Sequence, residues 1–223
     1  MAIDSRLSNK PVYRNLQEMI KPAHTSLLII DMQEEYCGQG RRELGLDPTP
    51  QHVAAKVIGR LVVAARHVGV LPVFIKNDIS ARGYTHSGVA IANEIHVFGR
   101  YGVSTEDTPG SEFLLEIGFK PDDIVVRKNR NSSFHATNLD LVLRSNGVQT
   151  VVITGQATFA CVDTTARDAL CHDYYVVVVE DAVATVAEEL EYHTASLSVL
   201  RHFLPVCGVA SSDQLLALWG VTS

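Results

Sequence analysis

Short apolar runs alternate along this chain with segments in which apolar residues recur every three or four positions. A run that is apolar throughout is typical of a strand buried on both faces of a sheet. The apolar runs predict five strands and a short sixth segment, at 26–31, 71–76, 124–128, 150–154, 175–180 and 206–209.

Helices are predicted between these strands. From residue 53 to residue 68 the apolar positions follow a helical period, and Gly69 ends this helix. Thr137 is placed to cap a helix over 138–145, with Asp140 three residues further on. Three more helices are predicted, at about 161–172, 188–203 and 213–219. Strands that alternate with helices and lack hairpin dipeptides predict a parallel sheet with helices on both faces, a three-layer Rossmann-like α/β fold.

The length of the chain, 223 residues, suits one domain rather than two. We expect a single domain over 1–223, in which residues 1–25 form an N-terminal extension. The segment 78–110 has no clear period and is rich in Gly, Ser, Thr and His. Its length predicts an active-site loop or an oligomer contact rather than an ordinary connection.

Composition narrows the class of protein. Hydrophobic residues make up 46% of the chain and charged residues 20%, the balance of a soluble globular domain. A net charge of −6 is the opposite of what a nucleic-acid-binding protein carries. The longest apolar stretches, 27–30 and 176–179, are far too short to span a bilayer, and the first 25 residues lack the apolar core of a signal peptide. We therefore expect a cytoplasmic protein that acts on a small molecule and binds neither nucleic acid nor membrane.

The four cysteines show neither CxxC spacing nor the density of a disulfide scaffold, so free thiols in a reducing compartment are predicted. Cys37, Cys171 and Cys207 need no explanation beyond that of small buried hydrophobic residues. Cys161 differs from them because of its neighbours in the predicted fold.

Three chemically active residues follow predicted strands. Asp31 and Lys128 end the first and third strands, and the 150–154 strand runs through residues 155–160 into Cys161. Right-handed crossovers place these strand ends on one edge of the sheet, where such folds build their sites. A helix N-terminus and the Lys128 cation are both expected to lower the pKa of Cys161. Asp31 can accept the thiol proton, and Lys128 keeps that carboxyl group ionised.

Each of these residues also has a structural interpretation. An Asp that closes a buried strand is often a turn or cap residue, a strand-end Lys usually reaches solvent, and an intracellular Cys is commonly a core thiol. The meeting of an acid, an amine and a thiol at one sheet edge favours the catalytic interpretation.

Three segments carry a family resemblance. Residues 29–33 read Ile-Ile-Asp-Met-Gln, and residues 125–128 read Val-Val-Arg-Lys, followed by Ser133 and Phe134. Residues 155–169 read Gly-Gln-Ala-Thr-Phe-Ala-Cys-Val-Asp-Thr-Thr-Ala-Arg-Asp-Ala. In this order they resemble the three signatures of the isochorismatase-like cysteine hydrolases.

The resemblance implies a six-stranded parallel α/β/α fold, a homo-oligomer (dimer or tetramer), and a catalytic triad of Asp31, Lys128 and Cys161. It also implies a cis peptide bond between Gln156 and Ala157, which aims the amides of Ala157 and Cys161 at one point as an oxyanion hole. The implied reaction is thiolate attack on an amide or ureide carbonyl, loss of ammonia or an amine, and hydrolysis of the acyl-enzyme.

The branch of the family is narrowed by what stands after the second strand. Nicotinamidases carry an Asp-x-His metal motif there, whereas this chain reads Asn-Asp-Ile-Ser at 77–80, so no metal or other cofactor is expected. The segment around Lys128 is most similar to the branch of biuret hydrolase, ureidoacrylate amidohydrolase and N-carbamoylsarcosine amidase. Asn131 replaces the second lysine of the biuret enzymes, and Gln156 replaces the usual aliphatic residue, which argues against biuret.

Three residues are candidate substrate contacts: Asn77, Tyr36 and Gln156. Asn77 occupies a position where ureide-cleaving relatives contact substrate. Tyr36, one turn beyond Asp31, is expected either to wall the pocket or to pack against the next helix. His86 and His96 lack the spacing of metal ligands and are interpreted as loop residues.

Two other functions remain open. An isochorismatase-type vinyl-ether hydrolase would use Asp31 without a thiol, and Cys161 argues against it. A non-catalytic binding domain would not need the intact acid, amine and thiol.

Overall fold

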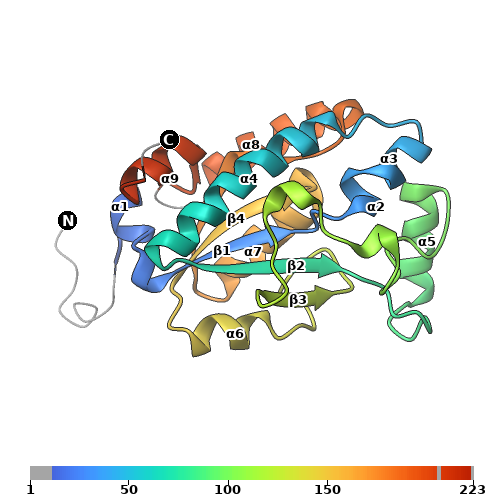
Figure 1. Cartoon of the computed structure of the whole chain (residues 1–223), viewed down its shortest axis with the longest axis horizontal. Coiled ribbons are helices and arrows are strands. Elements are labelled where there is room, and N and C mark those ends of the chain that lie inside the picture. Colours follow the sequence, from blue (N-terminus) through green and yellow to red (C-terminus); the bar gives the residue numbers. More distant parts are fainter. Residues whose placement is uncertain (1–11, 205–206, 222–223) are drawn as a thin grey trace.

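The computed structural model describes residues 12–204 and 207–221. In this part of the chain a parallel sheet forms the centre of the protein, with the strand order β3-β2-β1-β4-β5-β6 (Figure 1). The strands are β1 (Thr25–Ile30), β2 (Leu71–Asn77), β3 (Ile124–Lys128), β4 (Thr150–Gln156), β5 (Tyr175–Ala184) and β6 (Val209–Ala210). The predicted six-stranded parallel sheet is confirmed; of the predicted 206–209 segment, residue 206 lies outside the described residues.

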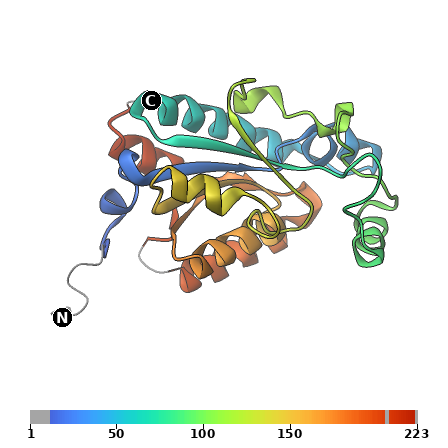
Figure 2. The ribbon, with the colours of Figure 1, turned by 90° about the horizontal axis from the view of Figure 1, so that it is seen from below.

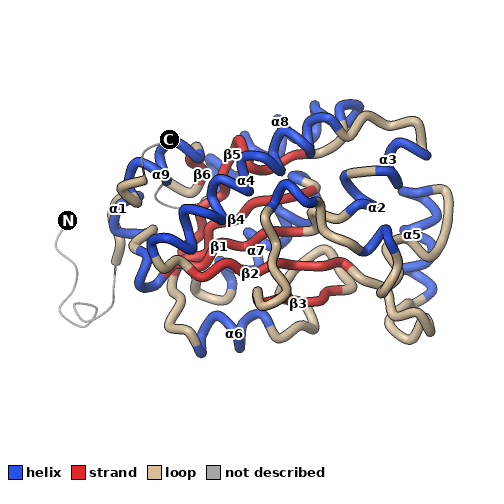
Figure 3. Tube along the Cα trace, viewed as in Figure 1, coloured by secondary structure: helices blue, strands red, loops and turns tan. Residues whose placement is uncertain are grey.

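Helices cover both faces of the sheet (Figures 1 and 2). On one face lie α4 (Thr49–Val68) and α9 (Ser212–Leu218), whose buried residues share a hydrophobic core with that side of the sheet. On the other face lie α6 (Leu139–Ser145), α7 (Asp163–Cys171) and α8 (Leu190–Phe203). The three layers predicted from the alternation of strands and helices are therefore present (Figure 3).

The central strand β1 explains why its sequence is apolar without alternation. Leu27 and Ile29 belong to the core beneath α4, whereas Leu28 and Ile30 belong to the core beneath α6, α7 and α8. All four side chains are completely buried. Successive residues of a strand point to opposite faces, so a strand covered on both sides favours apolar side chains at successive positions. Thr25 and Ser26, at the start of β1, are buried polar exceptions, and Ser26 Oγ donates to the Leu71 carbonyl oxygen.

Several element bounds differ from the predictions. Helix α4 begins at Thr49 rather than residue 53, because a proline in the first turn, Pro50, is compatible with a helix start. A π-helical turn, Thr158–Val162, precedes α7, so Cys161 lies in this turn and not in the α-helix. Shorter helices are α1 (Leu16–Met19), α2 (Glu34–Cys37) and α3 (Gln39–Glu43), and 3-10 turns are found at Pro22–His24, Pro109–Ser111, Leu115–Ile117 and Ala187–Glu189.

The segment 78–110, predicted without regular structure, contains helix α5 (Gly88–Phe98). The Ser87 side chain caps its first turn, and Gly99 ends it in the left-handed conformation. No residue of α5 is buried, and Val89 is 81% exposed. The helix lies outside the main body (Figures 1 and 2), so it has no buried face to produce the one-sided apolar period that sequence reasoning uses. Within the described residues, no helix is both long enough and apolar enough to cross a membrane.

A glycine allows the close approach of β4 to β1. Gly155 has a φ of 110°, and it pairs in register with Ile30 of β1. A Cβ atom at this position would lie 2.1 Å from the carbonyl oxygen of Ile30. Both the dihedral angle and the available space therefore require glycine.

We predict that Gly155→Ala lowers the free energy of unfolding by more than about 1 kcal/mol, because backbone strain and a clash with the Ile30 carbonyl act together. Gly147→Ala is the matched control, since Gly147 has a φ of 68° and nothing within 4 Å of the added atom. Urea denaturation of both variants measures the difference. Equal losses of stability would contradict the close approach.

Candidate active site

The C-terminal edge of the sheet brings the three predicted catalytic side chains together. Asp31 directly follows β1, Lys128 is the last residue of β3, and Cys161 lies in the π-helical turn after β4. The Lys128 Nζ is 2.8 Å from Asp31 Oδ2 and 3.3 Å from Cys161 Sγ. The ammonium group therefore stands between the acid and the thiol.

The site is enclosed. Asp31 and Lys128 are each 1% exposed, and Cys161 is partly buried. Lys128 Nζ also donates to the carbonyl oxygen of Arg130 at 3.0 Å. Within the described residues, Asp31 Oδ1 is buried and accepts no hydrogen bond, which leaves it available to accept a proton.

The charges and burial around Cys161 correct the prediction for the pKa of its thiol. Burial raises the pKa of Cys161 to about 12, Lys128 opposes this rise, and the negative charge of Asp31 adds to it. The expected lowering of the thiol pKa is wrong, because burial and the carboxylate outweigh the cation.

The pKa values of Asp31 and Lys128, the two partners of the thiol, are also shifted. Burial raises the pKa of Asp31, although the ion pair and hydrogen bond with Lys128 oppose this. Burial would lower the pKa of Lys128, but Asp31 and Cys161 outweigh it and raise the pKa. Lys128 therefore stays charged over the range in which Asp31 changes between acid and base.

Tyr36 and Asn77 both lie at this edge. The Tyr36 hydroxyl donates to the Asn77 carbonyl oxygen at 3.4 Å, and its ring packs on Phe98 of α5 at 5.8 Å. Burial, followed by the negative charges of Asp31 and Cys161, raises the pKa of Tyr36 well above its usual value. Tyr36 thus packs against a helix and also lies near the triad. Substrate contacts of Tyr36 and Asn77 stay predictions.

The third candidate contact, Gln156, turns inward. Its Nε2 donates to the backbone oxygen of Asp31 at 3.1 Å, and its Oε1 accepts from Gln51 Nε2 at 2.9 Å. Gln51, in α4, is completely buried and also donates to the Tyr36 carbonyl oxygen at 2.8 Å. Sequence reasoning missed Gln51 because it lies N-terminal to the predicted start of α4. A substrate contact of Gln156 stays a prediction.

The Gln156–Ala157 peptide bond is cis, as the family resemblance implies. The carbonyl oxygen of Ala157, which belongs to the next peptide unit, accepts hydrogen bonds from the amides of Ala160 at 3.0 Å and Val162 at 3.2 Å in the π-helical turn. The oxyanion role of the Ala157 and Cys161 amides stays a prediction.

The other three cysteines differ in burial. Cys37 is buried, as expected of a small hydrophobic residue. Cys171 and Cys207 are exposed, and the prediction that they are buried is wrong for both. Cys171 is the last residue of α7, and Cys207 lies in the connection before β6, so neither is covered by a helix layer.

No group of three or more His, Cys, Asp or Glu side chains that could hold a metal ion occurs in residues 12–204 and 207–221. His86 contacts Glu94 at 2.9 Å and packs against Tyr101, whereas His96 lies on α5. Metal independence stays a prediction.

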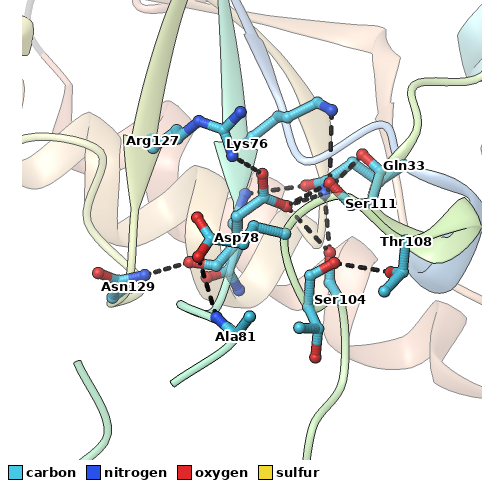
Figure 4. Close-up of polar contacts among 12 residues, drawn as sticks. Gln33, Lys76, Asp78, Ala81, Ser104, Thr108, Ser111, Arg127 and Asn129 are labelled. Carbon is cyan, nitrogen blue, oxygen red and sulfur yellow. Dashed lines mark hydrogen bonds and ion pairs between the residues drawn. The ribbon is translucent and has the colours of Figure 1, made fainter. Parts of the chain in front are cut away.

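A buried polar network behind the triad was missed by sequence reasoning. Its centre is Asp78, which contacts Gln33, Ser104, Ser111 and Arg127 (Figure 4). The available signal in the sequence is an acidic residue, Asp78, directly after a buried strand.

Comparison with known proteins decides the family. The family model described as "Isochorismatase domain" matches residues 25–211. The chain belongs to the isochorismatase family. This isochorismatase-family protein is accordingly a hydrolase.

Curated relatives and solved structures support this assignment. Ureidoacrylate amidohydrolase RutB from Enterobacter sp. (strain 638) is 31% identical over 202 residues, covering 85% of this chain and 87% of that protein. RutB from Variovorax paradoxus (strain S110) is 32% identical over 170 residues, covering 71% and 68%. N-carbamoylsarcosine amidase from Thermoplasma acidophilum superposes with a TM-score of 0.67 at 29% identity, covering 85% of this chain and 97% of that chain. A cysteine hydrolase from Pseudomonas syringae pv. phaseolicola 1448A shares the fold, with a TM-score of 0.79 at 22% identity and coverage of 95% and 98%.

We predict that the two partners of Cys161 shift its pKa in opposite directions. Asp31→Asn removes a negative charge that raises the thiol pKa from its usual value, so the pKa falls below about 12. Lys128→Met removes the opposing cation, so the pKa rises further. Ultraviolet absorbance of the thiolate, corrected with the same change in a Cys161→Ala background, measures both. Shifts of the same sign in the two variants would contradict this arrangement of charges.

Proposed function

We propose that this isochorismatase-family hydrolase is a cysteine amidohydrolase that cleaves a C–N bond of a small linear amide or ureide. The observation that carries the proposal is the contact of one buried ammonium group, Lys128 Nζ, with Asp31 and Cys161. The similarity to enzymes named as ureidoacrylate amidohydrolase and N-carbamoylsarcosine amidase supports the substrate class.

In the first half of the proposed reaction, Asp31 accepts the thiol proton as Cys161 Sγ attacks the substrate carbonyl carbon. Lys128 keeps its charge and stabilises the carboxylate. The amides of Ala157 and Cys161 donate hydrogen bonds to the developing oxyanion. Collapse of the intermediate breaks the C–N bond, and protonated Asp31 gives its proton to the departing nitrogen, which leaves as ammonia or an amine.

In the second half, the acyl group is bound to Cys161 as a thioester. The Asp31 carboxylate removes a proton from a water molecule, which attacks the thioester carbonyl carbon. The carbon–sulfur bond breaks, the thiol is restored with the proton from Asp31, and the acid product leaves. Because the thiol pKa is raised to about 12, a neutral thiol is the resting form at neutral pH.

The alternative function is the vinyl-ether hydrolysis of isochorismatase, in which an acid group works without a nucleophile. The 3.3 Å contact between Lys128 Nζ and Cys161 Sγ favours covalent catalysis, because an ammonium group beside the sulfur stabilises a developing thiolate. We also propose a cytoplasmic homo-oligomer, a dimer or tetramer, with a small molecule as its partner.

We predict that Cys161→Ala abolishes ammonia release from small amides, ureides and carbamoyl amino acids while circular dichroism stays unchanged. The exposed thiols provide matched controls, so Cys171→Ala and Cys207→Ala should keep the wild-type turnover number. Asp31→Asn should lower turnover by about 10²–10⁴-fold, the usual contribution of a general base.

A Cys161→Ala variant that still releases ammonia would contradict the acyl-enzyme. If Cys161→Ala cleaves isochorismate and Asp31→Asn does not, the vinyl-ether reaction is the correct one. If wild type releases ammonia from none of these compounds and does not cleave isochorismate, a non-catalytic domain is favoured.

A further prediction is that prolonged treatment with a chelator does not change the turnover number. Its basis is the sequence Asn-Asp-Ile-Ser at 77–80, where metal-dependent relatives carry Asp-x-His, together with the ion pair of Asp78 with Arg127. Activity is measured before and after chelation, with added zinc or manganese as the second condition. Loss in chelator and recovery with metal would place the enzyme in the metal-dependent branch.

A further inference from the structure

Asp78 lies at the end of the strand that separates β1 from β3. It is the first residue after β2, and its side chain is 2% exposed. In the strand order, β2 lies between β1 and β3, which carry Asp31 and Lys128. The two catalytic side chains therefore meet across the end of a strand that supplies neither of them, and their 2.8 Å contact depends on the spacing of three strand ends.

The carboxylate of Asp78 binds groups from both sides of β2 (Figure 4). Oδ1 accepts from Gln33 Nε2 at 3.0 Å, and Gln33 lies two residues beyond Asp31. Oδ2 pairs with Arg127 Nη1 at 2.6 Å, and Arg127 directly precedes Lys128. A single buried carboxylate thus connects the segment after β1 to the end of β3.

Main-chain atoms of the same strand end complete the connection. The Asp78 amide donates to the Lys128 carbonyl oxygen at 3.3 Å, and its carbonyl oxygen accepts from the side chain of Asn129. Gln33 Oε1 accepts from the Asn77 amide at 2.8 Å. Both chain neighbours of Lys128 are therefore bound to Asp78.

Two serines extend the network to the loop that follows α5. Ser111 Oγ donates to Asp78 Oδ1 at 2.8 Å, and Ser104 Oγ does so at 3.3 Å. Ser111 Oγ also accepts from Lys76 Nζ at 3.4 Å. Oδ1 therefore accepts three hydrogen bonds, and Oδ2 pairs with Arg127.

We propose that Asp78 is a positioning residue of the active site, which holds Asp31 and Lys128 in contact by binding the residues next to them in the chain. The inference rests on the proposed function, in which these two groups serve Cys161. Asp78 does not touch the reacting atoms; it acts through Gln33, Arg127 and Asn129.

A charge effect accompanies the geometric one. Burial raises the pKa of Asp31, Lys128 opposes it, and the negative charge of Asp78 adds a further rise. The titratable groups that bear on Asp31 are Lys128, Cys161 and Asp78. Arg127, with a side chain 51% exposed, pairs with Asp78 Oδ2 and offsets part of the charge of that carboxylate. A residue that served stability alone, far from the site, would not affect the titration of Asp31.

Two variants test the charge and the side-chain contacts of Asp78. Asp78→Asn keeps the size of the side chain and the Oδ1 acceptor, but it removes the charge and the Oδ2 acceptor that pairs with Arg127, so the pKa of Asp31 should fall. Carbon-13 NMR of carboxyl-labelled aspartate measures this, with the Asp31 signal assigned by its loss in Asp31→Asn. The acid limb of the kcat/KM profile, which reports the free enzyme, should move to lower pH by the same amount.

Asp78→Ala removes the side-chain contacts as well. We expect kcat per folded molecule to fall by about ten- to a hundredfold with KM nearly unchanged, because small displacements of catalytic groups have effects of this size. In a crystal structure of this variant, the distance from Lys128 Nζ to Asp31 Oδ2 should exceed 2.8 Å. If Asp78→Ala does not fold, Asp78→Asn with its NMR titration, together with the distance in its crystal structure, decides the question.

Asp123→Asn and Asp123→Ala are the matched controls. Asp123 pairs with Arg66 and has a side chain 10% exposed, but it precedes β3 at the end opposite to Lys128. These changes should lower stability without changing the pKa of Asp31, kcat per folded molecule, or the distance between Asp31 and Lys128.

The inference is overturned if Asp78→Ala loses no more kcat than Asp123→Ala and keeps the 2.8 Å contact, or if Asp78→Asn leaves the Asp31 titration unchanged. Failure of the proposed function looks different. In that case Cys161→Ala retains ammonia release or wild type shows none, while the distance and the titration still test the positioning role.

Discussion

The active site depends on one buried ammonium group. Lys128 is 1% exposed, and removing a charge from water is unfavourable unless hydrogen bonds and an opposite charge compensate it. Its Nζ contacts Asp31 Oδ2 at 2.8 Å, the Arg130 carbonyl oxygen at 3.0 Å and Cys161 Sγ at 3.3 Å. These three contacts use the three N–H donors of the ammonium group. The three strand ends must therefore converge within the length of one lysine side chain, and the parallel sheet with its strand order provides that convergence.

Buried polar side chains bind the chain next to Asp31 and Lys128 at several points. Gln156 binds the backbone oxygen of Asp31 and is itself bound by Gln51 of α4. Both polar ends of the Gln156 amide are therefore paired, as a buried amide requires, whereas Gln51 Oε1 has no hydrogen-bond partner among the described residues. Asp78 connects the segment after β1 to the end of β3, through Gln33 and Arg127. The side chains of the proposed triad are thus surrounded by paired amide and carboxylate groups.

Burial also explains the protonation state of the resting site. Burial raises the pKa of the Cys161 thiol to about 12, and burial also raises the pKa of Asp31 beside it. In the proposed reaction, the thiolate therefore forms only as the thiol proton moves to Asp31.

What the sequence by itself determined is local or carried by a contiguous motif. The unalternating apolar runs predicted the strands of a doubly covered sheet, and the signature segments indicated Asp31, Lys128, Cys161 and the cis bond before Ala157. The tertiary structure decided the rest. The thiol pKa follows from burial, which depends on all layers together. Helix α5 has no buried face and therefore no apolar period. The contacts of Gln156 and the Asp78 network join residues up to 125 positions apart. Interactions between distant segments leave no periodic trace in a single sequence, whereas burial on both faces of a strand restricts every residue within it.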